Sequence, residues 1–140
     1  MQHDFPVRDL ETHAVIGAAL EVHRELGCGF LESVYQEALA QEMADREIPF
    51  EHEVTLRVRF KERMLHSVYR VYFVCHGELL VEVKALPHIG GVEQAQMINY
   101  LKAARRARGL ILNFGARSLQ CKRVGCSSAL HDVEGIEAST

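Results

Sequence analysis

The stretch Leu79-Leu80-Val81-Glu82-Val83-Lys84-Ala85 decides the fold of this chain. It is a short apolar run, rich in β-branched residues and bounded by turn residues on both sides, and such runs favour buried strands. Alternate side chains of a strand share a face, so we expect Glu82 and Lys84 to point the same way. Burying two charged groups costs several kcal/mol per ion, by rough estimate, unless they pair or bind something. The pattern therefore indicates either a structural ion pair or a catalytic pair.

Length and composition indicate one domain of ordinary globular character. The chain has 140 residues, of which 48% are hydrophobic and 25% charged, and this length supports a proper core. We expect a single domain over residues 1–126 and a flexible polar tail over 127–140. No apolar run approaches the ~18 residues needed to span a membrane, and the first residues lack a signal-peptide pattern. These features predict a cytoplasmic protein without membrane contact, whose four scattered cysteines are reduced thiols.

Charge is strongly segregated along the sequence. Residues 1–56 carry 12 acidic and 3 basic side chains, whereas residues 101–126 carry 7 basic and no acidic ones. Residues 57–70 add 5 basic side chains against one glutamate. Such segregation can create a basic surface for phosphates on an acidic protein. It can equally let two parts of one fold neutralise each other, or form a self-complementary surface in a homo-oligomer, and composition leaves the three open.

The hydrophobic periodicity predicts an α/β domain. Two helices come first, followed by three strands joined by short turns, which should form an antiparallel meander. A third helix and one or two further strands complete the order. The expected helices are 9–26, 30–46 and 92–107, and the expected strands are 54–60, 65–75, 79–85, 109–115 and 119–124.

An early helix carries Glu32 within the segment Gly29-Phe30-Leu31-Glu32-Ser33-Val34-Tyr35, and the third strand carries Glu82-x-Lys84. In these motifs and in the order of its elements the chain resembles the PD-(D/E)XK nuclease superfamily. The Gly29–Tyr35 segment fits the motif that names the GxxExxY family within it. The similarity spans roughly residues 8–125 and includes the segments 22–27, 81–84, 96–102 and 109–115.

This resemblance implies a restriction-endonuclease-like core, a mixed sheet of four to five strands flanked by helices. It implies that Glu82, Lys84, Glu32 and Gln96 form the catalytic set, with Glu82 and Glu32 as ligands of Mg²⁺. Magnesium takes hard oxygen ligands and stabilises charge on a phosphate that is attacked in line. The implied partner is nucleic acid, and the basic residues that we expect to bind it are Lys102, Arg105, Arg106, Arg70, Lys122 and Arg123.

One departure from the family pattern concerns the metal site. The family has an aspartate ten residues before the glutamate of Glu-x-Lys, and this chain has Tyr72 there, with no acidic residue from Leu65 to Gly77. A phenol with a pKa of about 10 stays protonated and is a poor Mg²⁺ ligand. We therefore expect a weak Mg²⁺ site and impaired phosphodiester hydrolysis, with nucleic-acid binding retained. The alternatives are an active nuclease with an altered ligand set and a non-enzymatic module for protein interaction or oligomerisation.

Overall fold

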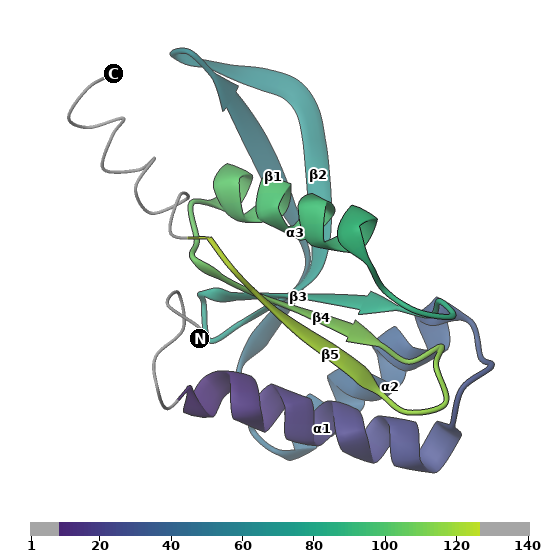
Figure 1. The fold of residues 1–140 in the computed structure, drawn as a ribbon. Helices are drawn as coiled ribbons and strands as arrows, with labels where there is room; N and C mark the ends of the chain where they lie inside the picture. Colours follow the sequence, from purple (N-terminus) through teal and green to yellow (C-terminus); the bar gives the residue numbers. More distant parts are fainter. Residues whose placement is uncertain (1–8, 127–140) are drawn as a thin grey trace.

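The computed structural model describes residues 9–126, so the expected tail over 127–140 lies outside the described part. Three helices and five strands follow the predicted order (Figure 1). Their bounds are α1 Leu10–Leu26, α2 Glu32–Asp45, β1 Phe50–Phe60, β2 Arg63–Cys75, β3 Leu79–Lys84, α3 Gly91–Ala104, β4 Arg108–Asn113 and β5 Gln120–Gly125. Within residues 9–126 no helix is long and apolar enough to cross a membrane.

The strands form one mixed sheet in the order β1-β2-β3-β4-β5. The pairs β1/β2, β2/β3 and β4/β5 are antiparallel, while β3 and β4 are parallel. Helix α3 makes the crossover that a parallel pair requires. The expected meander over the first three strands is confirmed, and so is the α/β fold with a mixed sheet and flanking helices.

Helices cover both faces of the sheet (Figure 1). One core cluster lies between the sheet and α1 with α2, and includes Tyr35, Phe73 and Phe114. A second cluster lies between the sheet and α3, and includes Met97 and Leu101. Strand β4 is buried along almost its whole length, as an interior strand covered on both faces should be.

Local signals fix the ends of α1, which lie within one residue of the expected range 9–26. The Asp9 side chain accepts a hydrogen bond from the Thr12 backbone N–H at 3.1 Å and so caps the first turn. Gly27 ends the helix with a φ of 67°, a left-handed conformation that glycine adopts without steric cost. Both features depend on neighbours in sequence, which explains why the sequence alone predicts them.

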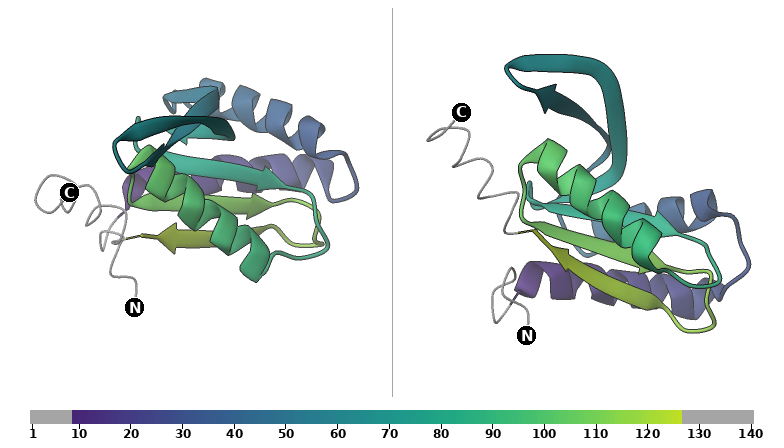
Figure 2. Two further views of the ribbon diagram at one scale, coloured as in Figure 1. Left: turned by 90° about the horizontal axis from the view of Figure 1, so that it is seen from above. Right: turned by 45° about the horizontal axis from the view of Figure 1, so that its top comes forward.

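Strands β1 and β2 continue far beyond the rest of the sheet. Strand β2 pairs with β3 at only three positions, Phe73–Val81, Val74–Leu80 and Cys75–Leu79, whereas β1 and β2 stay paired up to their connecting turn. We call residues 57–70, the far part of this hairpin, the arm. It projects from the body of the molecule and passes over α3 (Figure 2), and residues 61–70 are all exposed.

Several element bounds, and the exposure of one side chain, differ from the sequence-based expectation. Helix α3 ends at Ala104 rather than 107, because Arg105 takes a left-handed conformation and its N–H turns back to Leu101 and Lys102. Strand β1 begins at Phe50, four residues early. At its other end, Phe60 is 57% exposed, although its alternation predicts burial, because the arm has no layer beneath its tip.

Some of the segregated charges neutralise each other through ion pairs within the fold. The Arg108 guanidinium lies 2.7 Å from a carboxylate oxygen of Asp9 and 2.7 Å from one of Glu11. The Asp9 side chain is 3% exposed and that of Arg108 is 12% exposed. This cation joins the acidic N-terminal helix to β4, so it is not part of a basic surface.

Candidate active site

Strand β3 places Glu82 and Lys84 on one face, as its alternation predicts. Leu80, two residues before Glu82, belongs to the cluster beneath α3, whereas Val81 and Val83 belong to the cluster beneath α1 and α2. The side chains of Glu82 and Lys84 are only 12% and 18% exposed. Both charged groups therefore sit largely buried on the α3 side of the sheet.

The two charged groups are held by a small polar network. The Tyr72 backbone N–H donates to Glu82 Oε1 at 3.1 Å. Lys84 Nζ lies 3.8 Å from Glu82 Oε2 and donates to Gln96 Oε1 on α3 at 3.0 Å. The structure thus brings together three of the four residues expected to form the catalytic set, at the point where β2 leaves β3.

Burial decides the protonation behaviour of Glu82. Desolvation raises the pKa of this carboxyl to about 6, because it penalises the charged form. The hydrogen bond from the Tyr72 N–H and the charge of Lys84 act in the opposite direction, and the negative charge of Glu32 raises the pKa further. Glu32 therefore lies within electrostatic reach of Glu82.

The loop before α2 positions Glu32. Gly29 has a φ of 113°, which a side chain would strain, and Glu32 is the first residue of α2. The Tyr35 hydroxyl donates to the Gly27 carbonyl at 2.6 Å and accepts from the Phe30 N–H at 3.2 Å. Glycine and tyrosine of the Gly29–Tyr35 motif are thus structural residues, and they hold the exposed glutamate between them at the helix start.

The ring of Tyr72 packs on the α2 side of the sheet. It touches the core cluster beneath α1 and α2 and lies with its centroid 4.7 Å from that of Phe73 and 6.1 Å from that of His52. It also lines a hollow of about 460 Å³ together with residues of α2. Position 72 is adjacent to Glu82 through its backbone, but its phenol belongs to the packing against α2.

The donor set does not fit a resident Mg²⁺ ion. Residues 9–126 contain no group of three or more histidine, cysteine, aspartate or glutamate side chains that could hold a metal. The site offers two carboxylates, those of Glu82 and Glu32, and desolvation raises the pKa of the Glu82 carboxyl to about 6. Magnesium requires near-octahedral coordination by oxygen ligands, with carboxylates in the ionised form, and these two side chains supply only some of the oxygens that it needs.

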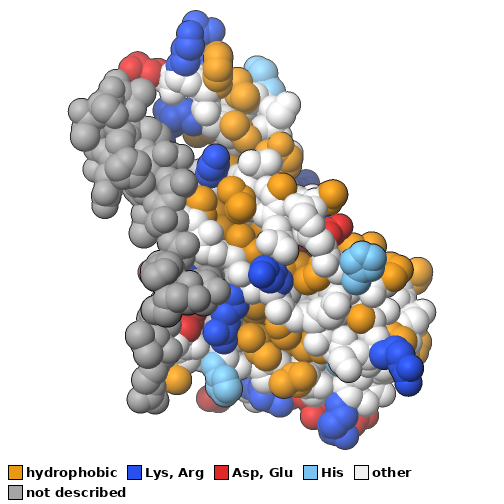
Figure 3. All heavy atoms as spheres, viewed as in Figure 1, with side chains coloured by type: hydrophobic (Ala, Val, Ile, Leu, Met, Phe, Trp, Pro, Cys, Tyr) orange, Lys and Arg blue, Asp and Glu red, His pale blue; other side chains and the backbone are white. Residues whose placement is uncertain are grey.

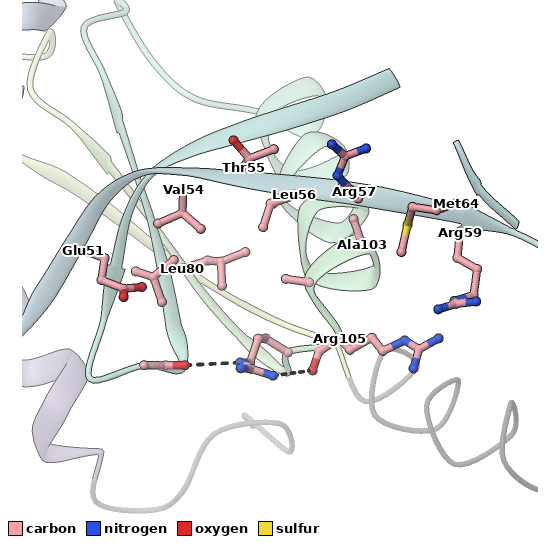
Figure 4. Close-up of a pocket in the computed structure, with 14 residues that line it drawn as sticks. Glu51, Val54, Thr55, Leu56, Arg57, Arg59, Met64, Leu80, Ala103 and Arg105 are labelled. Atoms are coloured by element: carbon pink, nitrogen blue, oxygen red, sulfur yellow. Dashed lines mark hydrogen bonds between the residues drawn. The ribbon is translucent and has the colours of Figure 1, made fainter. Parts of the chain in front are cut away.

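Basic side chains gather between the arm and the C-terminal end of α3. Arg59 of β1 and Arg105 after α3 line a hollow of about 700 Å³, and both also line an adjoining hollow of about 450 Å³ with Lys102. Arg106 lines the first hollow as well and donates to the Gly77 carbonyl at 3.3 Å. Figure 4 shows Arg59 and Arg105 extending into the same opening, with Thr55 and Arg57 on the other side of β1. Lys102, Arg105 and Arg106, three of the expected nucleic-acid ligands, are therefore neighbours.

The other three expected nucleic-acid ligands lie elsewhere. Arg70 follows Tyr69, whose ring faces α3, so Arg70 points to the opposite face of the arm. Lys122 and Arg123 are on β5, at the far edge of the sheet from β1. The space-filling view shows lysine and arginine side chains in several separate places, with apolar side chains between them (Figure 3). The role of these three residues stays a prediction.

Sequence reasoning missed two residues near the hollows. Tyr69 lines the smaller hollow, and its ring centroid is 5.4 Å from that of Tyr100 on α3. The low aromatic content of the chain gave no reason to expect such a pair. The only local signal for the pair is that Tyr69 lies on the strand face opposite Arg70. This signal indicates a contact with Tyr100 only if the arm passes over α3, which the sequence does not show.

Comparison with known proteins bears on the same residues. A family model of the PD-(D/E)XK nuclease superfamily matches residues 9–124. The crystal structure of SSO0001 is similar, with 13% sequence identity, a TM-score of 0.48, and coverage of 91% of this chain and 86% of that one. No curated protein matches the sequence.

Proposed function

Because the chain belongs to the PD-(D/E)XK nuclease superfamily, we propose that it is a GxxExxY-type member that binds nucleic acid and is impaired in Mg²⁺-dependent phosphodiester hydrolysis. One observation carries the proposal. Glu82 is the single largely buried carboxylate of the candidate site, and its oxygens are engaged by the Tyr72 backbone N–H and by Lys84. The proposal on the family rests on the Gly29–Tyr35 motif, whose glycine and tyrosine have clear structural roles.

The chemistry of the site supports impaired rather than absent function. When bound, a divalent ion stabilises charge on the attacked phosphate and lowers the pKa of a water. Lys84 retains a cation at the site, and Gln96 orients it through a 3.0 Å hydrogen bond. A group held in this way can position a water or a phosphate oxygen. One largely buried carboxylate is, however, a poor basis for metal binding, and because desolvation raises its pKa to about 6, protons compete with the metal near and below that pH.

Nucleic-acid binding is supported by the basic side chains beside the arm. Lys102, Arg105 and Arg106 lie together at the end of α3. Phosphate contacts of this kind give affinity that falls with rising salt and is independent of base sequence. Binding and hydrolysis therefore depend on different residues, and one can persist without the other.

Titration calorimetry with Mg²⁺ and Mn²⁺ tests the metal part of the proposal. We expect weak binding by the wild type and no binding by Glu82→Gln. We expect a gain in affinity in Tyr72→Asp, because an aspartate lacks the ring that packs against α2 and can turn toward Glu82, whose carboxylate already accepts from the backbone N–H of residue 72. Tight wild-type binding would overturn the proposed impairment. Unchanged binding in Tyr72→Asp would show that position 72 does not face the ion.

A cleavage assay on labelled DNA and RNA tests the catalytic set. Any residual Mg²⁺-dependent cleavage should disappear in Glu82→Ala and in Lys84→Ala, whereas Glu37→Ala, an exposed glutamate on α2, should leave it unchanged. Cleavage at the wild-type rate by both site variants would mean that the chemistry takes place elsewhere.

The exposed apolar residues of the arm favour a second candidate, a homo-oligomer formed through the arm. Phe60, Met64 and Leu65 are 57%, 48% and 38% exposed, and exposed apolar groups are common at interfaces. Light scattering after size-exclusion chromatography should then give a mass that falls to that of one chain in Phe60→Ser/Leu65→Ser. A single-chain mass for the wild type would eliminate this candidate.

A further inference from the structure

The two adjoining hollows beside the arm form one continuous groove, which we call the arm groove. They share Arg59, Ala103 and Arg105, and their volumes of about 700 and 450 Å³ lie in the range of sites that hold small ligands or short segments. One wall is the inner face of the arm and the other is the C-terminal half of α3. The arm therefore covers the groove on the side opposite α3.

Most of the charged side chains that line the arm groove are basic. The charged side chains that line it are Arg59, Lys102, Arg105, Arg106 and one carboxylate, Glu51, while Arg57 borders the groove but points to the other side of β1. Within residues 9–126, the side chains of Arg59, Lys102 and Arg105 make no ion pair, unlike that of Arg108. Positive charge that the fold leaves uncompensated in a concave site concentrates anions there.

An aromatic surface lies at the same place. Tyr69 is 44% exposed and lines the groove beside Lys102 and Asn99. Its ring leans against that of Tyr100, with an interplanar angle of 49°. Tyr100 is 6% exposed, and burial followed by the negative charge of Glu82 raises the pKa of its phenol. The tyrosine pair therefore runs from the groove toward the candidate active site.

We propose that the arm groove binds a single-stranded segment of nucleic acid, with phosphates against Arg59, Lys102 and Arg105 and a base stacked on Tyr69. Proteins that bind unpaired strands combine a basic groove along the backbone with aromatic side chains that stack on bases. A duplex keeps its bases stacked on one another, so it offers the groove phosphates but no base face for Tyr69. The inference rests on the proposed nucleic-acid binding and specifies its substrate class.

Fluorescence anisotropy with two probes tests the inference. The probes are a labelled 12-nucleotide DNA of mixed sequence and the duplex of the same sequence, each at 50 and 200 mM salt, without divalent ions. The groove variant is Arg59→Ala/Lys102→Ala. Its matched control is Lys61→Ala/Arg117→Ala, which removes one lysine and one arginine from exposed positions that neither line the groove nor belong to the expected nucleic-acid ligands.

We expect the single strand to bind more tightly than the duplex. The groove variant should lower the slope of log affinity against log salt by about 1.4, since each lost phosphate contact removes about 0.7 for a single strand, and the control should leave it nearly unchanged. Tyr69→Leu, which keeps apolar contact with Tyr100, should weaken single-strand binding by about tenfold while leaving the salt slope intact.

The outcomes separate the inference from the proposed function. Binding of neither probe would refute nucleic-acid binding itself. Equal or tighter binding of the duplex would keep that function and overturn the single-strand groove. Equal losses in the groove and control variants would likewise overturn it, because binding would then follow net charge alone.

Discussion

Glu82 should destabilise the folded protein at neutral pH. Its pKa of about 6 in the fold exceeds the ordinary 4.5 of a glutamate, so folding favours the protonated form. A difference of about 1.5 pKa units at 1.36 kcal/mol per unit corresponds to roughly 2 kcal/mol. Glu82→Gln mimics the protonated side chain and keeps an acceptor oxygen for the Tyr72 N–H. It should therefore raise the free energy of unfolding by about 2 kcal/mol above pH 7.

The sign of this effect reverses the usual behaviour of a paired carboxylate. A raised carboxyl pKa contributes stability that is complete below the unfolded pKa and is lost as the pH rises through the folded value. The wild type should therefore lose stability between about pH 4.5 and 6 relative to Glu82→Gln. At pH 4.5 the two proteins should differ by only a few tenths of a kcal/mol.

Urea denaturation at pH 4.5, 6.0 and 7.5 measures the difference, with Glu37→Gln on the exposed surface of α2 as the control. The control should track the wild type at every pH. A gain in Glu82→Gln that is the same at all three values would come from packing and not from protonation. A variant less stable than the wild type at pH 7.5 would refute the reasoning, because the ion pair with Lys84 would then outweigh desolvation.

Three further predictions concern stability and thiol chemistry. Arg108→Met should lower the free energy of unfolding by about 3 kcal/mol, because it leaves the buried Asp9 carboxylate without its cation. Arg24→Met breaks a pair whose arginine side chain is 66% exposed, and it should lower the free energy of unfolding far less, because solvent screens that pair. Equal losses in urea melts would contradict the difference. Gly115→Ala should lower the free energy of unfolding by about 2 kcal/mol or more, as overpacking of a core does. Its added Cβ would lie 2.4 Å from backbone atoms of Leu86, in the loop that follows β3. A thermal melting temperature within 2 °C of that of the wild type would argue against this close approach. Iodoacetamide at pH 8 should modify Cys28, which is exposed, and spare Cys75, whose buried thiol has a pKa raised to about 12; mass spectrometry of the native protein reads out both, and early labelling of Cys75 would show that the core opens.

Features that depend on neighbours in sequence could be predicted from the sequence. The alternation of β3 places Glu82 and Lys84 on one face, and Asp9 and Gly27 mark the ends of α1, because capping and strand alternation are local. The fold class followed from the order of such elements. The candidate catalytic set followed from resemblance, and the structure brings Glu82, Lys84 and Gln96 into contact.

Features that depend on the path of the arm could not be predicted. Strand β2 leaves β3 after three paired positions, and this divergence, not alternation, sets which side the Tyr72 ring takes. Glu53, opposite that region on β1, has a φ of 56°, and nothing in its sequence context signals it. The same holds for Tyr69, whose position over α3 depends on the curvature of a hairpin. The charge of Arg108 is visible in the sequence, but its buried partner Asp9 is 99 residues away.

The position of β1 at the edge of the sheet has a consequence for solubility. An edge strand offers open backbone groups to other chains, and long apolar edges promote aggregation. Here Arg57 and Arg59 place positive charge on β1, and a register irregularity lies between them. Both features disfavour pairing of this edge with another copy of the chain. Polyanions that neutralise these arginines would remove that protection. We therefore expect the protein to precipitate most readily at a polyanion ratio that just cancels the charge of the arm, and to redissolve on either side of it.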